Sequence, residues 1–306
     1  MLGVLTGFAI IAAIIVVGYV VGRIGLLGPD ARPILARLVF FVLAPSLLFT
    51  ILADAEVGQL FSPLLVVSLL AAATSFAVYG LVARLLWHRG VAETVIGALS
   101  AGDVNGNNIG IPVAVYVLGD PAYVAPVILV QLLLFAPLGL AVLDAAQQGR
   151  VSVGRLATGP LRNPIIIGSA LGLLVALLDV TPPEALMEPF RIIGGAAVPL
   201  MLLSYGISLH GQKVLEQGSD RRDAVLASAI KLLLMPAVAW TAGVLLFDLD
   251  HQELFVVVAL AALPTAQNVF NYAQRYRRGE TLARDAIFVT TIGSLPVLLG
   301  VAAVLR

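Results

Sequence analysis

The sequence predicts an all-α integral membrane protein of about ten transmembrane helices, built as two inverted repeats of five. Three observations indicate this fold class. The 306 residues are 60% hydrophobic and 12% charged, with a mean hydropathy of +1.02, which is far outside the range of soluble domains. The apolar residues fall into separate windows, and the charges between the windows alternate in sign. The two halves of the chain also share motifs at matching positions.

Each apolar window is long enough for a helix to cross the hydrocarbon region, which takes roughly 20 residues. The first window lacks the basic start and the small-residue cleavage site of a signal peptide, so we expect it to be retained as a span. The windows lie at residues 2–22, 33–53, 60–86, 92–118, 121–145, 164–180, 190–209, 224–247, 253–274 and 283–305.

The connections between windows carry the charge, and they are alternately basic and acidic. Because basic loops stay in the cytoplasm, this pattern predicts a multi-pass protein of a bacterial cytoplasmic (inner) membrane with both termini outside. Two basic residues, Arg191 and Lys231, do not fit the alternation. We expect their long side chains to reach the membrane surface from the ends of spans seven and eight.

The two halves of the chain align without a gap when one is shifted by 160 positions, which places Asn108 on Asn268 and Gly119 on Gly279. The predicted units are a first repeat at 1–148, a cytoplasmic hinge at 149–162 and a second repeat at 163–306. Because each repeat has an odd number of spans, the copies must face opposite ways in the membrane. Inverted repeats of this kind are typical of secondary transporters.

Spans four and nine each contain a polar stretch that disfavours a continuous helix, "GDVNGNNIGIP" at 102–112 and "LPTAQNVFN" at 263–271. Glycine and asparagine are weak helix formers, whereas proline is tolerated in a first helical turn. We expect a second half-helix from about residue 109 in span four. Asparagine is a good N-cap, so we also expect the side chains around each break to cap the helix that follows. The residues expected to shape the breaks are Gly106, Gly110, Pro112 and Pro264.

Inversion makes the two broken helices antiparallel, so they are expected to cross at mid-membrane. Each outgoing half-helix then directs about half a positive charge toward the crossing, which favours an anion. The sequence shows no basic side chain near either break, so amides and helix ends must supply the attraction. The residues expected to contact the substrate are Asn105, Asn107, Asn108, Gln267, Asn268, Thr265 and Gln131.

Asp103 allows two interpretations. A carboxylate inside a membrane is a candidate functional group, here for proton or cation coupling. It could equally bond only the unwound backbone beside it.

Other classes of site find little support in the sequence. The chain has no cysteine, and its three histidines lie in loops, so no metal site is expected. No nucleophile with a base is found, which predicts a protein that is not an enzyme, has no catalytic residues and needs no cofactor. The net charge is zero without long basic runs, which argues against a nucleic-acid partner.

Two motifs, "NGNNIGIP" at 105–112 and "LPTAQNVFNYAQRY" at 263–276, resemble those of the auxin efflux carrier family, which includes the plant PIN auxin transporters and bacterial permeases. The resemblance implies a scaffold domain of spans 1, 2, 6 and 7, a transport domain of spans 3–5 and 8–10, a homodimer, and elevator-type alternating access. It also implies that Asn105 contacts a substrate carboxylate. Val104 replaces a proline of the plant pattern, and span three lacks the plant carriers' charged residues, so auxin itself is not assumed.

The expected function is that of a secondary active or facilitative transporter of small organic anions, either auxin-like carboxylates or dicarboxylates, with the lipid bilayer as its other partner. The alternative is a sodium- or proton-coupled antiporter or symporter that uses Asp103. A receptor or a structural membrane protein is a third class, although it gives no reason for two matching polar breaks.

Overall fold

The computed structural model describes residues 2–28, 30–55, 63–148, 163–209 and 220–305. Within these ranges the regular structure is helical, apart from a single isolated β-bridge. The predicted hinge at 149–162 lies outside the described residues.

The helices follow the apolar windows, and the chain is an all-helical membrane protein. Six helical segments are each long and apolar enough to cross a membrane: residues 33–53, 63–86, 121–147, 184–209, 221–246 and 280–305. Shorter apolar helices occupy the other windows, at 9–24, 91–102, 106–118, 164–177 and 251–261. The seventh window therefore begins earlier than predicted, at Glu184, and its helix is interrupted at Ala196.

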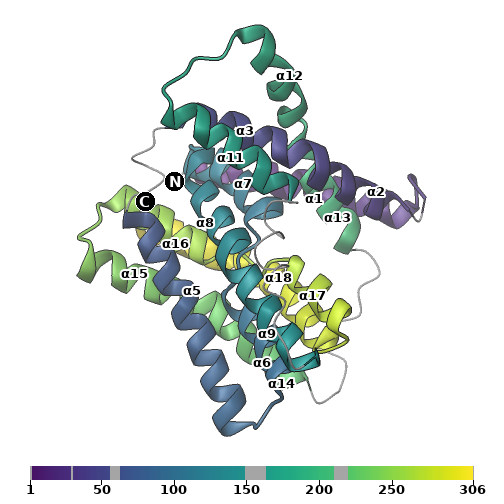
Figure 1. The fold of residues 1–306 in the computed structure, drawn as a ribbon, viewed down its shortest axis with the longest axis vertical. Helices are drawn as coiled ribbons and strands as arrows, with labels where there is room; N and C mark the ends of the chain where they lie inside the picture. The colour runs from purple at the N-terminus through teal and green to yellow at the C-terminus, as the bar shows by residue number, and fades with distance from the viewer. Residues whose placement is uncertain (1, 29, 56–62, 149–162, 210–219, 306) are drawn as a thin grey trace.

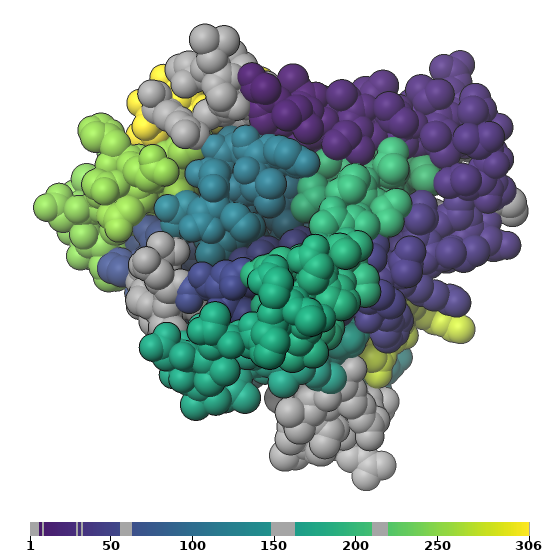
Figure 2. All heavy atoms as spheres, turned by 90° about the horizontal axis from the view of Figure 1, so that it is seen from above, coloured from purple at the N-terminus to yellow at the C-terminus, as the bar shows by residue number. Residues whose placement is uncertain are grey.

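The helices form two bundles that lie one above the other in Figure 1. The first bundle comprises residues 2–53 and 164–209, in which α1 packs on α13 and α3 packs on α11 and α12. Figure 2 shows the purple N-terminal helices of this bundle on one side of the molecule and the yellow-green α15–α16 region on the other. The helices of the first bundle are α1 (Leu2–Ile24), α2 (Ala31–Leu38), η1 (Val39–Leu43), α3 (Ala44–Ala53), α11 (Pro164–Leu177), α12 (Glu184–Gly195) and α13 (Ala197–Leu209).

The second bundle comprises residues 63–148 and 221–305, and α5, α6, α14, α15, α16 and α18 pack against one another within it. Its helices before the gap are α5 (Pro63–Leu81), η2 (Val82–Leu86), α6 (Val91–Gly102), η3 (Gly106–Gly110), α7 (Ile111–Val113), η4 (Ala114–Leu118), η5 (Pro121–Val124), α8 (Ala125–Val130), η6 (Gln131–Phe135) and α9 (Ala136–Gln148). Those after it are α14 (Arg221–Ala229), η8 (Ile230–Leu234), α15 (Met235–Leu246), α16 (His251–Ala261), α17 (Asn268–Tyr276) and α18 (Glu280–Leu305).

Glycines allow the helices of the first bundle to approach closely. A methyl group at Gly206 of α13 would overlap the backbone of α1 at Ile15, and one at Gly168 of α11 would overlap the backbone of α3 at Pro45. Small residues at helix contacts are common in membranes, where close packing has to replace the hydrophobic effect. The first bundle is therefore tightly packed along two helix pairs.

Prolines explain the π-helical geometry of several spans. Pro45, Pro112, Pro137 and Pro236 each follow a π-helical segment, and the residue before each proline donates its N–H to the carbonyl five residues back. Proline has no N–H to continue the α-helical ladder, and single π-turns commonly absorb such a defect. The spans therefore continue through these prolines as helices.

A buried ion pair fastens the second bundle at one end. Asp223 of α14 accepts hydrogen bonds from Arg89, with Nε–Oδ1 at 3.1 Å and Nη2–Oδ2 at 2.5 Å, and from the Tyr79 hydroxyl at 3.3 Å. The Asp223 side chain is only 3% exposed. The bond to Asp223 raises the pKa of the Arg89 guanidinium, which lies in the loop before α6. The cluster ties α5 and the start of α6 to α14.

Asp223→Asn is expected to lower the free energy of unfolding by about 1.5–3 kcal/mol, because it removes the charge from the buried group that accepts hydrogen bonds from Arg89 and Tyr79. Thermal unfolding in detergent measures the effect. The matched control is Glu93→Gln, whose partner Arg278 is exposed and whose loss is expected to cost less than about 1 kcal/mol. Equal losses in the two variants would contradict this account.

Candidate functional site

Both polar stretches interrupt their helices. In the fourth segment α6 ends at Gly102, Asp103 is extended with φ −76° and ψ 136°, and the next helix, η3, begins at Gly106. In the ninth segment α16 ends at Ala261 and α17 begins at Asn268. The chain therefore leaves the helical conformation at the two places where glycine, asparagine and proline disfavour it.

The two breaks lie side by side and run in opposite directions. Val104 and Thr265 form an isolated antiparallel bridge. The Asn105 N–H donates to the Pro264 carbonyl at 2.8 Å, and the Ala266 N–H donates to the Asp103 carbonyl at 3.3 Å. Unwound backbone inside a membrane protein needs such partners because lipid supplies none. Each break thus provides the hydrogen bonds that the other lacks.

Two predicted contact residues, Gln131 and Thr265, hold the breaks in place. The Gln131 side chain accepts from the Val104 N–H at 2.6 Å and donates to the Val104 carbonyl at 3.1 Å. Thr265 is fully buried and donates its hydroxyl to the Ser100 carbonyl at 2.6 Å. Gln131 still borders the cavity described below, whereas Thr265 does not. We therefore remove Thr265 from the expected substrate contacts, because its side chain is used for packing the break.

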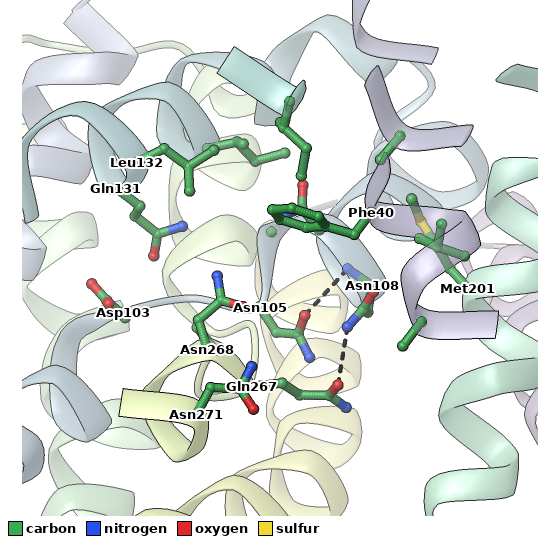
Figure 3. A pocket seen from close by; sticks show the side chains of 18 of the residues that line it. Phe40, Asp103, Asn105, Asn108, Gln131, Leu132, Met201, Gln267, Asn268 and Asn271 are labelled. Carbon is green, nitrogen blue, oxygen red and sulfur yellow. Dashed lines mark hydrogen bonds between the residues drawn. The ribbon is translucent and has the colours of Figure 1, made fainter. Parts of the chain in front are cut away.

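The asparagines of the first break form a connected set (Figure 3). Asn105 Oδ1 accepts from the Asn108 N–H at 3.2 Å, as expected of an N-cap, and Asn108 Nδ2 donates to Gln267 Oε1 at 3.2 Å. Asn105 Nδ2 and Asn107 Oδ1 are buried without a hydrogen-bond partner. Leaving a buried amide group unpaired costs about 1–3 kcal/mol, so these atoms are candidates for binding a polar ligand.

A cavity of about 460 Å³ lies between this polar set and the first bundle. From the second bundle it is lined by Asp103, Asn105, Asn107, Asn108, Gln131, Gln267 and Asn268 among others. Figure 3 shows Phe40 and Met201 of the first bundle on the side away from Asp103 and Gln131. The volume lies within the usual range of small-molecule sites. All but one of the predicted contact residues therefore border a single cavity between the bundles.

The sequence reasoning missed several lining residues: Arg37, Asn163, Asn271 and Tyr272. The expectation that no basic side chain lies near the breaks was wrong, since Arg37 of α2 lines the cavity. Arg37 is far in sequence from both breaks, and only the packing of the bundles brings it here. Asn271 had a signal, because it lies three residues after Asn268 and so shares its helix face.

Comparison with known proteins agrees with this architecture. A family model described as a membrane transport protein matches the chain twice, over residues 4–150 and 150–301. The chain belongs to this family. Membership confirms the likeness to auxin efflux carriers that the two motifs indicated, and it places the chain among transporters and not among enzymes.

Three relatives of this membrane transport protein align over nearly their whole length. A Rhizobium meliloti (strain 1021) protein named "Putative malonate transporter" is 26% identical, over 96% of this chain and 93% of its own. An uncharacterized transporter of Methanothermobacter thermautotrophicus is 27% identical, over 93% of each chain. One of Methanocaldococcus jannaschii is 23% identical, over 94% of each.

The half-helices of this transport protein begin differently from the prediction. The second half of the fourth segment starts at Gly106 and not near residue 109, so Pro112 lies inside it, where the π-turn accommodates its missing N–H. Gln267 precedes α17 but makes no side-chain capping bond. Pro264 contributes its carbonyl to the bridge, and Gly110 packs where a methyl group would lie 2.9 Å from Val124. The capping prediction is thus confirmed for Asn105 and wrong for Gln267.

The prediction that Lys231 reaches the membrane surface was wrong as well. Lys231 of η8 has no exposed surface, and its Nζ donates to the Ala261 carbonyl at 2.6 Å and contacts Met235 Sδ at 3.1 Å. Ala261 is the last residue of α16, so the ammonium group lies at the negative end of that helix. A second basic residue therefore lies at the breaks, behind the cavity.

Gln131→Leu is expected to lower the free energy of unfolding by about 2 kcal/mol or more, since it leaves the Val104 N–H and carbonyl without their side-chain partner. Thermal unfolding in detergent measures the loss. Gln147→Leu serves as the control, because Gln147 is exposed on α9. If the Gln131 variant were as stable as the control, Gln131 would not be holding the break.

Proposed function

We propose that this chain is a secondary active or facilitative transporter of small organic anions, which binds its substrate in the cavity at the two breaks. One observation carries the proposal. Two interrupted helices, hydrogen-bonded to each other, direct the starts of their second halves and a set of amides into a single cavity between two helix bundles. A merely structural helix kink would not need unpaired amide groups beside a cavity.

The electrostatics of the cavity favour a negatively charged ligand. The N-terminal ends of η3 and α17 carry partial positive charge, and helix N-termini are common anion sites. The buried Nδ2 of Asn105 is a donor without a partner, and Arg37 adds a full positive charge from the first bundle. A carboxylate can use all three features at once.

We infer that the substrates are small carboxylates, either auxin-like monocarboxylates or dicarboxylates. The relative named for malonate supports a dicarboxylate. In that case one carboxylate would lie at the amides of the breaks and the other toward Arg37. The cavity volume of about 460 Å³ leaves room for a larger organic acid.

We propose that the fold is a five-plus-five inverted repeat whose fourth and ninth spans cross at mid-membrane. The first bundle would be the scaffold domain, and the second bundle the transport domain. Dense packing within each bundle and the position of the cavity between them support elevator-type movement of one bundle past the other. A homodimer, a bacterial cytoplasmic membrane and both termini outside belong to the same proposal and rest on the family and on the loop charges.

Uptake into proteoliposomes tests the function, with thermal unfolding as a screen for ligands. Acetate, malonate and succinate are suitable probes, because a ligand that binds the native state raises its stability by mass action. A probe that shifts the unfolding temperature is expected to enter proteoliposomes that hold the protein faster than it enters empty ones. If all three probes gave no shift and no uptake, the proposal of a small organic anion would be abandoned.

Asn105→Asp is expected to reduce uptake of a confirmed substrate at least tenfold. Aspartate keeps the oxygen that caps η3, but it replaces the unpaired Nδ2 donor with a charge that repels an anion, and a hydrogen bond to a charged group is worth about 1.5–3 kcal/mol. Gln274→Ala, an exposed position on α17, is the control and is expected to transport normally. Parental uptake by the Asn105 variant would show that the substrate binds elsewhere.

A further inference from the structure

Two charged residues, Asp103 and Lys231, are buried next to the breaks without forming the ion pair expected of such neighbours. Asp103 is 3% exposed, borders the cavity, and has a buried Oδ1 without a hydrogen-bond partner. Lys231 is fully buried, and its ammonium group donates to the Ala261 carbonyl. The charge of Lys231 nevertheless acts on Asp103. Burying single charges is expensive, so this arrangement calls for a role.

The Lys231 ammonium group has a hydrogen-bond partner, which Asp103 Oδ1 lacks among the described residues. The ammonium group is stabilised by a carbonyl and by the negative end of α16, and neither depends on the substrate. Asp103 faces the cavity, and the part of the chain that the structure describes gives its Oδ1 no hydrogen-bond partner. The other titratable groups that line this cavity are Tyr272 of α17, Arg37 of α2 and Tyr205 of α13.

An anion in the cavity would be repelled by an ionised Asp103. A proton on Asp103 removes this repulsion and leaves the positive charge of Lys231 to balance the anion. Like charges that share a site favour protonation of one of them, so a bound anion favours the protonated form of Asp103. The linkage is reciprocal, so protonation of Asp103 raises the affinity for the anion by the same factor. Without the anion, Lys231 favours the ionised carboxylate. The site in the second bundle would then be neutral in both states. In the empty state the ionised Asp103 balances Lys231, and in the loaded state a bound monoanion balances it.

We propose that Asp103 and Lys231 form a proton-coupling site. Asp103 takes up one proton from the solvent when a substrate anion binds beside it, Lys231 keeps its charge as the fixed counter-ion, and anion and proton are carried together and released together on the other side. Arg37 belongs to the first bundle, so it would not move across the membrane with the second bundle. This inference rests on the proposed function, because it needs an anion in the cavity.

Proton uptake on binding tests the proposal directly. The purified protein is kept in weakly buffered detergent solution that contains a pH-indicating dye. The probe is whichever of acetate, malonate and succinate gives the largest thermal shift. The solution is held above neutral pH so that the probe is ionised. One proton is expected to be taken up for each anion bound. The Kd is expected to tighten by about tenfold for each pH unit of acidification within the titration range of Asp103.

The variants separate this site from the anion site itself. Asp103→Asn is expected to bind the anion without proton uptake and with a Kd that no longer depends on pH. Lys231→Gln is expected to do the same, because Asp103 without its counter-ion stays protonated before the anion arrives. The matched control is Asp248→Asn, an exposed loop residue with φ +47° that asparagine tolerates, and it is expected to keep the proton uptake.

Anion binding by the parent without proton uptake would overturn the coupling site and leave the proposed function standing, as would binding that requires sodium instead. Retained proton uptake in Asp103→Asn would also overturn it. If that variant does not fold, the stoichiometry of the parent and the Lys231 variant still decide the question. If none of the probes binds, the proposed function fails, and the coupling site fails with it.

Discussion

The structure depends on pairing the backbone N–H and C=O groups at two helix interruptions. A helix that unwinds in a membrane exposes N–H and C=O groups that lipid leaves unpaired. Here the interruptions run antiparallel and exchange hydrogen bonds through Asn105, Pro264, Asp103 and Ala266. Neither break would be stable alone. The pairing of the fourth and ninth segments, and hence the association of the two halves of the chain, follows from this requirement.

The same pairing separates two kinds of helix end. The starts of η3 and α17 carry partial positive charge and face the cavity, whereas the end of α16 carries partial negative charge and meets Lys231. A broken helix therefore offers a place for an anion and a place for a cation only a few residues apart. Lys231 lies at the negative end, and the positive ends border the cavity.

The breaks could be predicted because their causes are local. Glycine, asparagine and proline act on their own stretch of backbone, so the end of α6 at Gly102 and the cap formed by Asn105 are visible in the sequence. The burial of Lys231 is not local, since it depends on a carbonyl 30 residues away. Arg37 likewise reaches the cavity only because the two bundles meet there. Thr265 has the residue type of a binding group, but packing against Ser100 uses its hydroxyl.

The hydrogen bonds described for the two breaks all end within the second bundle: on Gln131, Ser100 and Thr290, and between the breaks themselves. The first bundle lines the cavity but contributes to none of these hydrogen bonds. Under the elevator-type movement proposed above, these bonds would stay intact after the cargo is released. The empty second bundle would then return without refolding, so a net flow of solute would need no second molecule for the return stroke.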